Sequence, residues 1–294
     1  MMKVPTVGAV ACTVGLALLF SSAGALAQRT TFDKTVPMVD RPITLKKGHA
    51  EFGMDLVVGL DKGAAGDHVA LASGYLSDRY DGVSISYGVS DRFEIGAALE
   101  MLWWDRGHGL DILGSVYVFA KWAFLENLGV EVGLQLPSKA GEMGRLVVHR
   151  GSILLSAPFK YPIVPGVMAI HARPDVWVGF AKTGYYGVDS SPQITVFADL
   201  GLTFNITPEL FLDVSVGVGK PVQGYTNAGG LKDGVLFLAQ GLKSRGTDMF
   251  LPASVWLGYT VIPSLDIGLS FTFQDLNGHG IDNRNLTITS AFRF

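Results

Sequence analysis

Hydrophobic and polar residues alternate with a period of two along most of the chain beyond residue 47. In the final segment, Leu286, Ile288 and Phe292 share one parity, whereas Thr287 and Thr289 share the other. Successive side chains of a β-strand point to opposite faces, so this alternation predicts strands with one apolar and one polar face. Twelve such segments are predicted, and they span residues 48–60, 82–90, 92–104, 111–124, 129–137, 151–161, 166–181, 192–206, 209–219, 249–262, 264–275 and 284–294.

The connections between the predicted strands alternate between short and long without exception. The short connections are tight turns, formed by residues 90–91, 126–128, 162–165, 207–208 and 262–264. The long connections are rich in Gly, Asp and Lys, and they span residues 61–81, 105–110, 138–150, 182–191, 220–248 and 276–283. Membrane barrels with an even number of strands have short periplasmic turns and longer external loops. The alternation therefore predicts such a barrel, with both termini on the periplasmic side.

Composition leads to the same fold class. Hydrophobic residues make up 48% of the chain, yet beyond residue 27 no uninterrupted apolar run approaches the ~20 residues that a membrane-spanning helix needs. In a bilayer, a closed barrel is the only other structure that pairs every backbone N–H and C=O group. The predicted fold is therefore all-β, a transmembrane antiparallel up-and-down β-barrel of about 12 strands.

The first 27 residues have the features of a cleavable secretory signal peptide. Lys3 supplies a positive start, residues 7–20 are almost continuously apolar, and Ala25-Leu26-Ala27 forms a cleavage site of the small-x-small type. We therefore expect residues 1–27 to direct Sec-type export and to be removed. Residues 28–47 then form a periplasmic N-terminal segment that could tuck into the lumen as a plug, and residues 48–294 form the barrel.

Removal of the signal peptide would also remove Cys12, the only cysteine of the sequence. Disulfides, cysteine nucleophiles and cysteine-based metal sites are then excluded from the exported chain. The formal net charge of −3 does not indicate a nucleic-acid partner. No cofactor is predicted.

Two parts of the sequence resemble known proteins. The terminal Phe292 and Phe294, within alternating apolar residues, resemble the signal that the barrel-assembly machinery reads. The chain as a whole resembles Gram-negative outer-membrane β-barrel proteins. The hairpin Tyr87–Gly96, with the sequence YGVSDRFEIG, is similar to a hairpin of the barrel family associated with meta-pathway phenol degradation. The resemblance implies an outer-membrane location, with membrane lipid and the assembly machinery as partners.

The polar parity of the strands places charged residues inside the predicted barrel, since an acidic face would be costly against lipid. The predicted lumen acids are Glu51, Asp55, Glu94, Glu100, Glu131, Asp175, Asp199, Asp213 and Asp266. The predicted basic or titratable lumen residues are Lys121, Lys160, Arg173, Arg293 and His171. The excess of acids favours cations or polar neutral solutes in an open pore. Alternatively, these groups pair across the lumen and only satisfy one another.

One group of lumen residues is the best candidate for selectivity. His171, Arg173 and Asp175 fall on one inward row of a single strand, with Asp55 and Asp199 predicted at similar depth. They would form a constriction or a solute-binding cluster, or equally a buried ion-pair network that closes a narrow lumen.

The external connections contain further candidates. Val235, Leu236, Phe237 and Leu238 form an apolar stretch, which would either fold into the lumen as a constriction or extend the barrel wall as strand. Four loop histidines are scattered without metal-ligand spacing, so no metal site is predicted; they are His68, His108, His149 and His279. Asp67, Asp105 and His108 could meet at the rim in the manner of a hydrolase.

The function predicted from the sequence is an outer-membrane channel. It would let a small polar or aromatic solute pass by passive or facilitated diffusion through a mildly cation-favouring lumen, without enzymatic activity. The alternative is a closed structural or interaction barrel that works through its external loops, and the third possibility is a rim hydrolase. The sequence leaves the oligomeric state open.

Overall fold

The structure of the protein is a computed structural model, in which almost all regular elements are β-strands. It describes residues 34–61, 68–71, 83–100, 102–105, 109–111, 115–136, 149–181, 192–223, 249, 251–273, 276 and 283–294. A short 3₁₀ helix, η2 (Met38–Asp40), precedes the strands. The strands are β1 (Ala50–Asp61), β2 (His68–Leu71), β3 (Val83–Ser90), β4 (Phe93–Glu100), β5 (Leu102–Asp105), β6 (Gly109–Asp111), β7 (Ser115–Leu125), β8 (Leu128–Leu136), β9 (His149–Ser156), β10 (Phe159–Val164), β11 (Met168–Ala181), β12 (Gln193–Asn205), β13 (Leu210–Gln223), β14 (Ala253–Ile262), β15 (Leu265–Phe273) and β16 (Asn283–Arg293).

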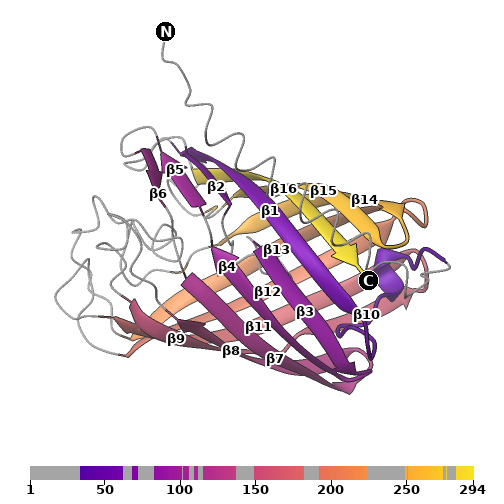
Figure 1. Ribbon diagram of the computed structural model, residues 1–294, viewed down its shortest axis with the longest axis horizontal. Helices are drawn as coiled ribbons and strands as arrows, with labels where there is room; N and C mark the ends of the chain where they lie inside the picture. Colours follow the sequence, from indigo (N-terminus) through magenta and orange to yellow (C-terminus); the bar gives the residue numbers. More distant parts are fainter. Residues whose placement is uncertain are drawn as a thin grey trace, which may run out of the picture.

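The strands form one closed antiparallel barrel with twelve positions (Figure 1). Three positions are shared by strands that follow one another in the wall: β2 with β3, β4 with β5, and β6 with β7. A fourth is shared by β9 and β10, which both pair with β8 and β11. The predicted antiparallel barrel of about 12 strands is therefore confirmed.

The barrel is closed by the first and last strands. β1 pairs with β16 from Glu51 opposite Arg293 to Asp61 opposite Asn283. Beyond this ladder, the Ala50 N–H donates to the Phe294 carbonyl at 2.8 Å, and the Phe294 N–H donates back at 3.0 Å. The final residue of the chain is thus part of the seam, and both strand ends lie at the same end of the barrel (Figure 1).

All five tight turns occur where the sequence predicts hairpins. They consist of residues 91–92, 126–127, 165–167, 206–209 and 263–264, with boundaries at most three residues from the predicted ones. We call the end of the barrel that carries them the tight-turn end. The N-terminal segment (residues 34–49) and Phe294 lie at this end, because β1 starts beside the β3–β4 hairpin and its Ala50 pairs with Tyr87.

The predicted strand at 151–161 is broken into β9 and β10, and two prolines explain the break. Pro158 and Pro174 lie on the two neighbouring strands at the gap between the two ladders, one position out of register, and neither has a backbone N–H to donate. The Ala157 N–H donates to the Pro174 carbonyl at 3.0 Å.

A second difference from the predicted strands is β2, which lies within a predicted loop and pairs with both β1 and β5.

The barrel has an apolar exterior and a polar interior, the reverse of a soluble barrel. In β8, Val130, Val132 and Leu134 point outward and are 37–44% exposed, whereas Glu131 between them is 1% exposed. The pattern suits lipid outside and water inside. In outer-membrane barrels, the apolar side chains point outward and the polar side chains point inward.

None of the helical residues that the structure describes belongs to a helix long and apolar enough to cross a bilayer.

Neighbouring residues of β3 test the assignment of the two faces. Ile85 is outward and 51% exposed, whereas Ser86 is inward and opposite Glu51 on β1. We expect Ile85→Arg to lower the free energy of unfolding in liposomes by about 2 kcal/mol, because the guanidinium would meet lipid. Ser86→Arg is the matched control and should cost far less, since Glu51 is next to it. Equal losses in urea titrations of the two variants would contradict this assignment.

Candidate functional site

Large inward side chains lie flat against the lumen wall, over glycines of the neighbouring strand. A Cβ at Gly258 of β14 would lie 2.1 Å from the Phe211 ring on β13. Similarly, a Cβ at Gly133 of β8 would lie 1.7 Å from the Tyr117 hydroxyl on β7. At such distances the ring occupies the place that another side chain would take. Further pairs of this kind are Phe119 with Gly96, His171 with Gly201, Phe197 with Gly217 and Trp256 with Gly268.

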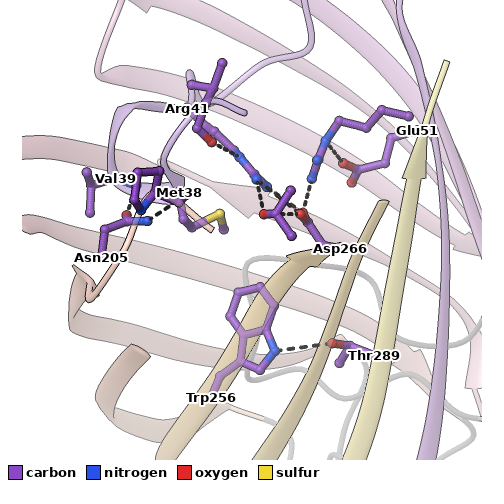
Figure 2. Close-up of polar contacts among 12 residues, drawn as sticks. Met38, Val39, Arg41, Glu51, Asn205, Trp256, Asp266 and Thr289 are labelled. Atoms are coloured by element: carbon purple, nitrogen blue, oxygen red, sulfur yellow. Dashed lines mark hydrogen bonds and ion pairs between the residues drawn. The ribbon is translucent and has the colours of Figure 1, made fainter. Parts of the chain in front are cut away.

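These rings form an inner layer of the wall instead of crossing the lumen. Phe211 is fully buried, and its ring meets that of Trp256 edge-on with centroids 4.8 Å apart. The Trp256 indole N–H also donates to the Thr289 hydroxyl at 3.2 Å, which fixes it to the wall (Figure 2). Since the rings run along the wall, bulky residues can face the lumen without filling its centre.

Arg173 of β11 holds two acids together on one side of the lumen. Its Nη2 donates to Oε1 of Glu131 on β8, and its Nε donates to Oδ1 of Asp175, both at 3.2 Å. Nη2 also donates to the Ser156 hydroxyl on β9 at 3.3 Å. A buried carboxylate such as Glu131 is costly without charged partners. The inward row predicted on this strand is therefore part of an ion-pair network.

Lys121 of β7 extends the network to β4. Its Nζ lies 3.5 Å from Glu94 Oε1 and 3.9 Å from Glu131 Oε2. The Tyr117 hydroxyl donates to Glu131 Oε1 at 3.2 Å. Acidic and basic side chains thus alternate around this part of the wall, from Glu94 to Asp175, so neighbouring charges attract instead of repelling one another.

His171 reaches across one strand to a carboxylate on the next. Its Nε2 lies 2.9 Å from Asp213 Oδ2 on β13, although β12 runs between the two strands. The ring passes over Gly201 of β12, where a Cβ would be 2.4 Å from it. The Thr203 hydroxyl also donates to Asp213 Oδ2, at 2.5 Å. The pair depends on the missing side chain at residue 201.

The structure brings four of the five predicted selectivity residues to one side of the barrel. Asp199 of β12 lies opposite Arg173 in the strand register, next to His171 and Asp175. Asp55 is 5% exposed and belongs to β1, on the opposite side of the barrel. It therefore faces this group across the lumen, and it does not form a cluster with it. A selectivity role for the five residues stays a prediction.

A second charged group lies near the tight-turn end (Figure 2). Arg293 of β16 donates from Nη2 to Asp266 Oδ2 on β15 at 2.5 Å, and its Nε lies 2.8 Å from Glu51 Oε2 on β1. Arg41 of the N-terminal segment donates from Nη2 to Asp266 Oδ1 at 3.1 Å and from Nη1 to Oδ2 of the same carboxylate. One carboxylate thus binds two guanidinium groups, one of which comes from outside the barrel wall.

The N-terminal segment contacts hairpins around the whole mouth of the tight-turn end. The Val39 N–H donates to Asn205 Oδ1 at the end of β12 at 3.0 Å (Figure 2). The Leu45 N–H donates to Glu94 Oε2 on β4 at 2.7 Å. Val39 is 1% exposed and Thr44 is 3% exposed, so these side chains are as buried as a core. The segment is therefore packed into the barrel.

Within the second charged group, Arg41 is the member that the sequence analysis missed. The polar-face argument covered only strands, and Arg41 lies in a segment without alternation. Its proximity to Pro37 and Pro42 gave no indication of its partner, Asp266, 225 residues further along the chain.

Several predicted residues lie outside the described part of the chain. These are Val235, Leu236, Phe237 and Leu238 of the proposed constriction, Asp67 and His108 of the rim, and His279. Within the described residues, no three His, Cys, Asp or Glu side chains come together as a metal site would require. Phe292 and Phe294 have their rings 5.8 Å apart at the end of β16.

Comparisons with known proteins give structural likenesses and no sequence relative. No family model and no curated protein matches the chain. The NanC porin is 11% identical with a TM-score of 0.48, covering 81% of this chain and 98% of that one. A bacterial polysaccharide outer membrane secretin is 15% identical, with a TM-score of 0.48 and coverage of 83% and 97%. The translocator domain of the autotransporter NalP from Neisseria meningitidis is 10% identical, with a TM-score of 0.44 and coverage of 97% and 98%.

The packing of rings over glycines predicts a position-dependent cost of adding a methyl group. Gly258→Ala would force the fully buried Phe211 ring to move, so we expect a loss of about 1–3 kcal/mol in the free energy of unfolding. Gly53→Ala is the control, because the one close contact of its Cβ would be the Ser84 hydroxyl, at 2.5 Å, which can rotate away, and its other neighbours are at an ordinary 3.9 Å. Denaturant titrations that rank Gly53→Ala as the more damaging change would refute this packing argument.

Proposed function

We propose that the protein is a channel of the Gram-negative outer membrane, through which a small polar or aromatic solute passes by passive or facilitated diffusion. The observation that carries this proposal is a closed barrel with apolar side chains outside and charged, hydroxyl and glycine residues inside. In such a barrel, the tight-turn end and both chain termini face the periplasm. The proposal includes export with loss of residues 1–27 and assembly through Phe292 and Phe294.

The width of the barrel supports passage. Barrels of eight strands are filled by their own side chains, whereas barrels of sixteen or more leave an aqueous channel. Twelve positions lie between these cases, so the interior side chains decide. Here the inward rings lie along the wall, as Phe211 does over Gly258, so they take less of the lumen than side chains that point toward the axis.

The charge of the lumen supports a mild preference for cations. Among inward residues with described side chains, acids outnumber Lys and Arg; the acids are Glu51, Asp55, Glu94, Glu131, Asp175, Asp199, Asp213 and Asp266, and the bases are Lys121, Lys160, Arg173 and Arg293. Rings of carboxylates favour cations in pores. Asp55, His171, Arg173, Asp175 and Asp199 are the positions that we propose to set selectivity, since Asp55 faces the other four across the lumen.

A closed structural or interaction barrel is the second candidate. The ion pairs of Arg173 and the position of the N-terminal segment support it, because paired charges and a covered mouth are expected of a barrel without transport. The two functions differ in one measurable property, which is the ionic conductance of the folded protein.

Single-channel recording in a planar bilayer tests the proposal. The protein purified from the outer membrane should give discrete conductance steps, and the reversal potential in a salt gradient should show a cation preference. Asp199→Asn should weaken this preference, because it removes one negative charge from the lumen.

The matched control is Glu126→Gln, which removes the same charge from an exposed tight turn outside the lumen. It should leave the reversal potential unchanged. A correctly folded barrel without conductance, in the wild type and in Arg41→Ala, would reject the channel in favour of the closed barrel. An equal shift in Asp199→Asn and Glu126→Gln would reject the lumen site.

A further inference from the structure

We propose that the N-terminal segment is a gate across the tight-turn end, and that Asp266 and Thr260 form a guanidinium-binding site in which Arg41 acts as the latch. The inference deepens the proposed channel, and its statement about passage rests on that function. The binding site and the latch stand on the contacts of the described residues alone.

The segment spans the mouth from one side to the other. Between residues 39 and 45, its contacts move from one hairpin to another around the barrel. Arg41 bonds to β14 and β15, whereas Ile43 reaches β8 on the opposite side, where its Cδ1 would lie 3.0 Å from a Cβ at Gly129. The remaining contacts are Val39 with Asn205, Asp40 with the Gly166 N–H at 3.0 Å, Thr44 with the Asp91 carbonyl at 3.2 Å and Leu45 with Glu94.

Most of these contacts are single hydrogen bonds, whereas Arg41 forms a bidentate, charge-assisted pair. Its two terminal nitrogens bind the two oxygens of Asp266, and Nη2 also donates to the Thr260 hydroxyl at 3.1 Å. Thr260 in turn donates to Asp266 Oδ1 at 2.7 Å, which orients the carboxylate. Bidentate pairs of this kind are about twice as strong as neutral hydrogen bonds. Arg41 is therefore the strongest attachment of the segment that the structure describes.

The burial of the partner explains why the latch holds. The Asp266 side chain is only 2% exposed, and that of Arg41 is 13% exposed. Asp266 and Glu51 carry two negative charges, and Arg41 and Arg293 carry two positive charges, so the group is balanced while the segment is seated. Departure of Arg41 would leave an excess negative charge in a buried site, which is costly. The open state therefore needs a replacement cation, and the geometry favours a guanidinium group.

Accessibility of a buried position measures opening without any need for conductance. Val39→Cys places the only thiol of the exported chain at a position that is 1% exposed, so a water-soluble maleimide reacts only when the segment leaves. Adding Arg41→Ala should speed labelling at least about tenfold, which corresponds to ~1.4 kcal/mol and to the lower end of the range for a hydrogen bond to a charged group. Arg41→Lys keeps the positive charge but loses the planar pair of donors, so its labelling rate should lie between those of Val39→Cys with Arg41 intact and Val39→Cys with Arg41→Ala.

Lys47→Ala is the matched control, because it removes the same charge from an exposed position of the same segment. It should leave the labelling rate unchanged. Equal rates in Arg41→Ala and Lys47→Ala would overturn the latch, since any effect would then come from charge alone.

Competition tests the chemistry of the binding site. Methylguanidinium at millimolar concentration should speed labelling of Val39→Cys more than methylammonium at the same ionic strength, and Asp266→Asn should abolish the difference. Equal effects of the two cations on the Asp266 protein would overturn the guanidinium site.

A reversible lock tests whether the gate controls passage. The Val39 N–H donates to the Asn205 side chain, so the two residues are neighbours and cysteines in Val39→Cys/Asn205→Cys can be joined by a short, reducible thiol-reactive cross-linker. The joined protein should be silent in a bilayer, and the reduced protein should conduct. Equal conductance of joined and reduced protein would overturn the gate. Silence of every form, Arg41→Ala included, would instead reject the proposed channel, while the labelling rates still decide the latch.

Discussion

The structure depends on one constraint, which is that every backbone N–H and C=O group of a membrane-spanning strand must be paired within the sheet. The ladder between β1 and β16 meets it at the seam, and the bonds between Ala50 and Phe294 carry the pairing to the last residue. Closure fixes which face of each strand points inward. Because side chains alternate along each strand, closure also separates an apolar outer surface from a polar lumen.

The lumen shows how a barrel can contain bulky and charged residues and still remain polar inside. Rings lie over glycines of the next strand, so Phe211 and Tyr117 become part of the wall. Charges are held in pairs, since Arg173 and Lys121 both contact the buried Glu131. The same glycine arrangement lets His171 reach Asp213 across an intervening strand. Neighbouring strands thus supply both the room for a bulky side chain and the partner for a charged one.

The polar interior also makes the N-terminal segment possible. Backbone and side chains of residues 39–45 need hydrogen-bond partners when they are buried, and the inner ends of the hairpins supply them. An apolar lumen would offer this segment no hydrogen-bond partners. A lumen whose polar groups were all bonded to one another would likewise leave it none. Asp266, which binds Arg293 of the wall and Arg41 of the N-terminal segment at once, therefore connects the two.

The sequence by itself determined most of the strands, their faces and the five tight turns, because a period of two and the turn residues are local properties of the chain. It also placed Asp175 and Arg173 on the polar face. It did not predict the break between β9 and β10, which arises where Pro158 and Pro174 lie at the same gap of two neighbouring strands. Only the tertiary structure decided that Asp55 faces β11 from across the barrel, and that Arg41 binds Asp266, 225 residues away. Such pairs depend on strand register and barrel closure, and neither leaves a periodic signal in the sequence.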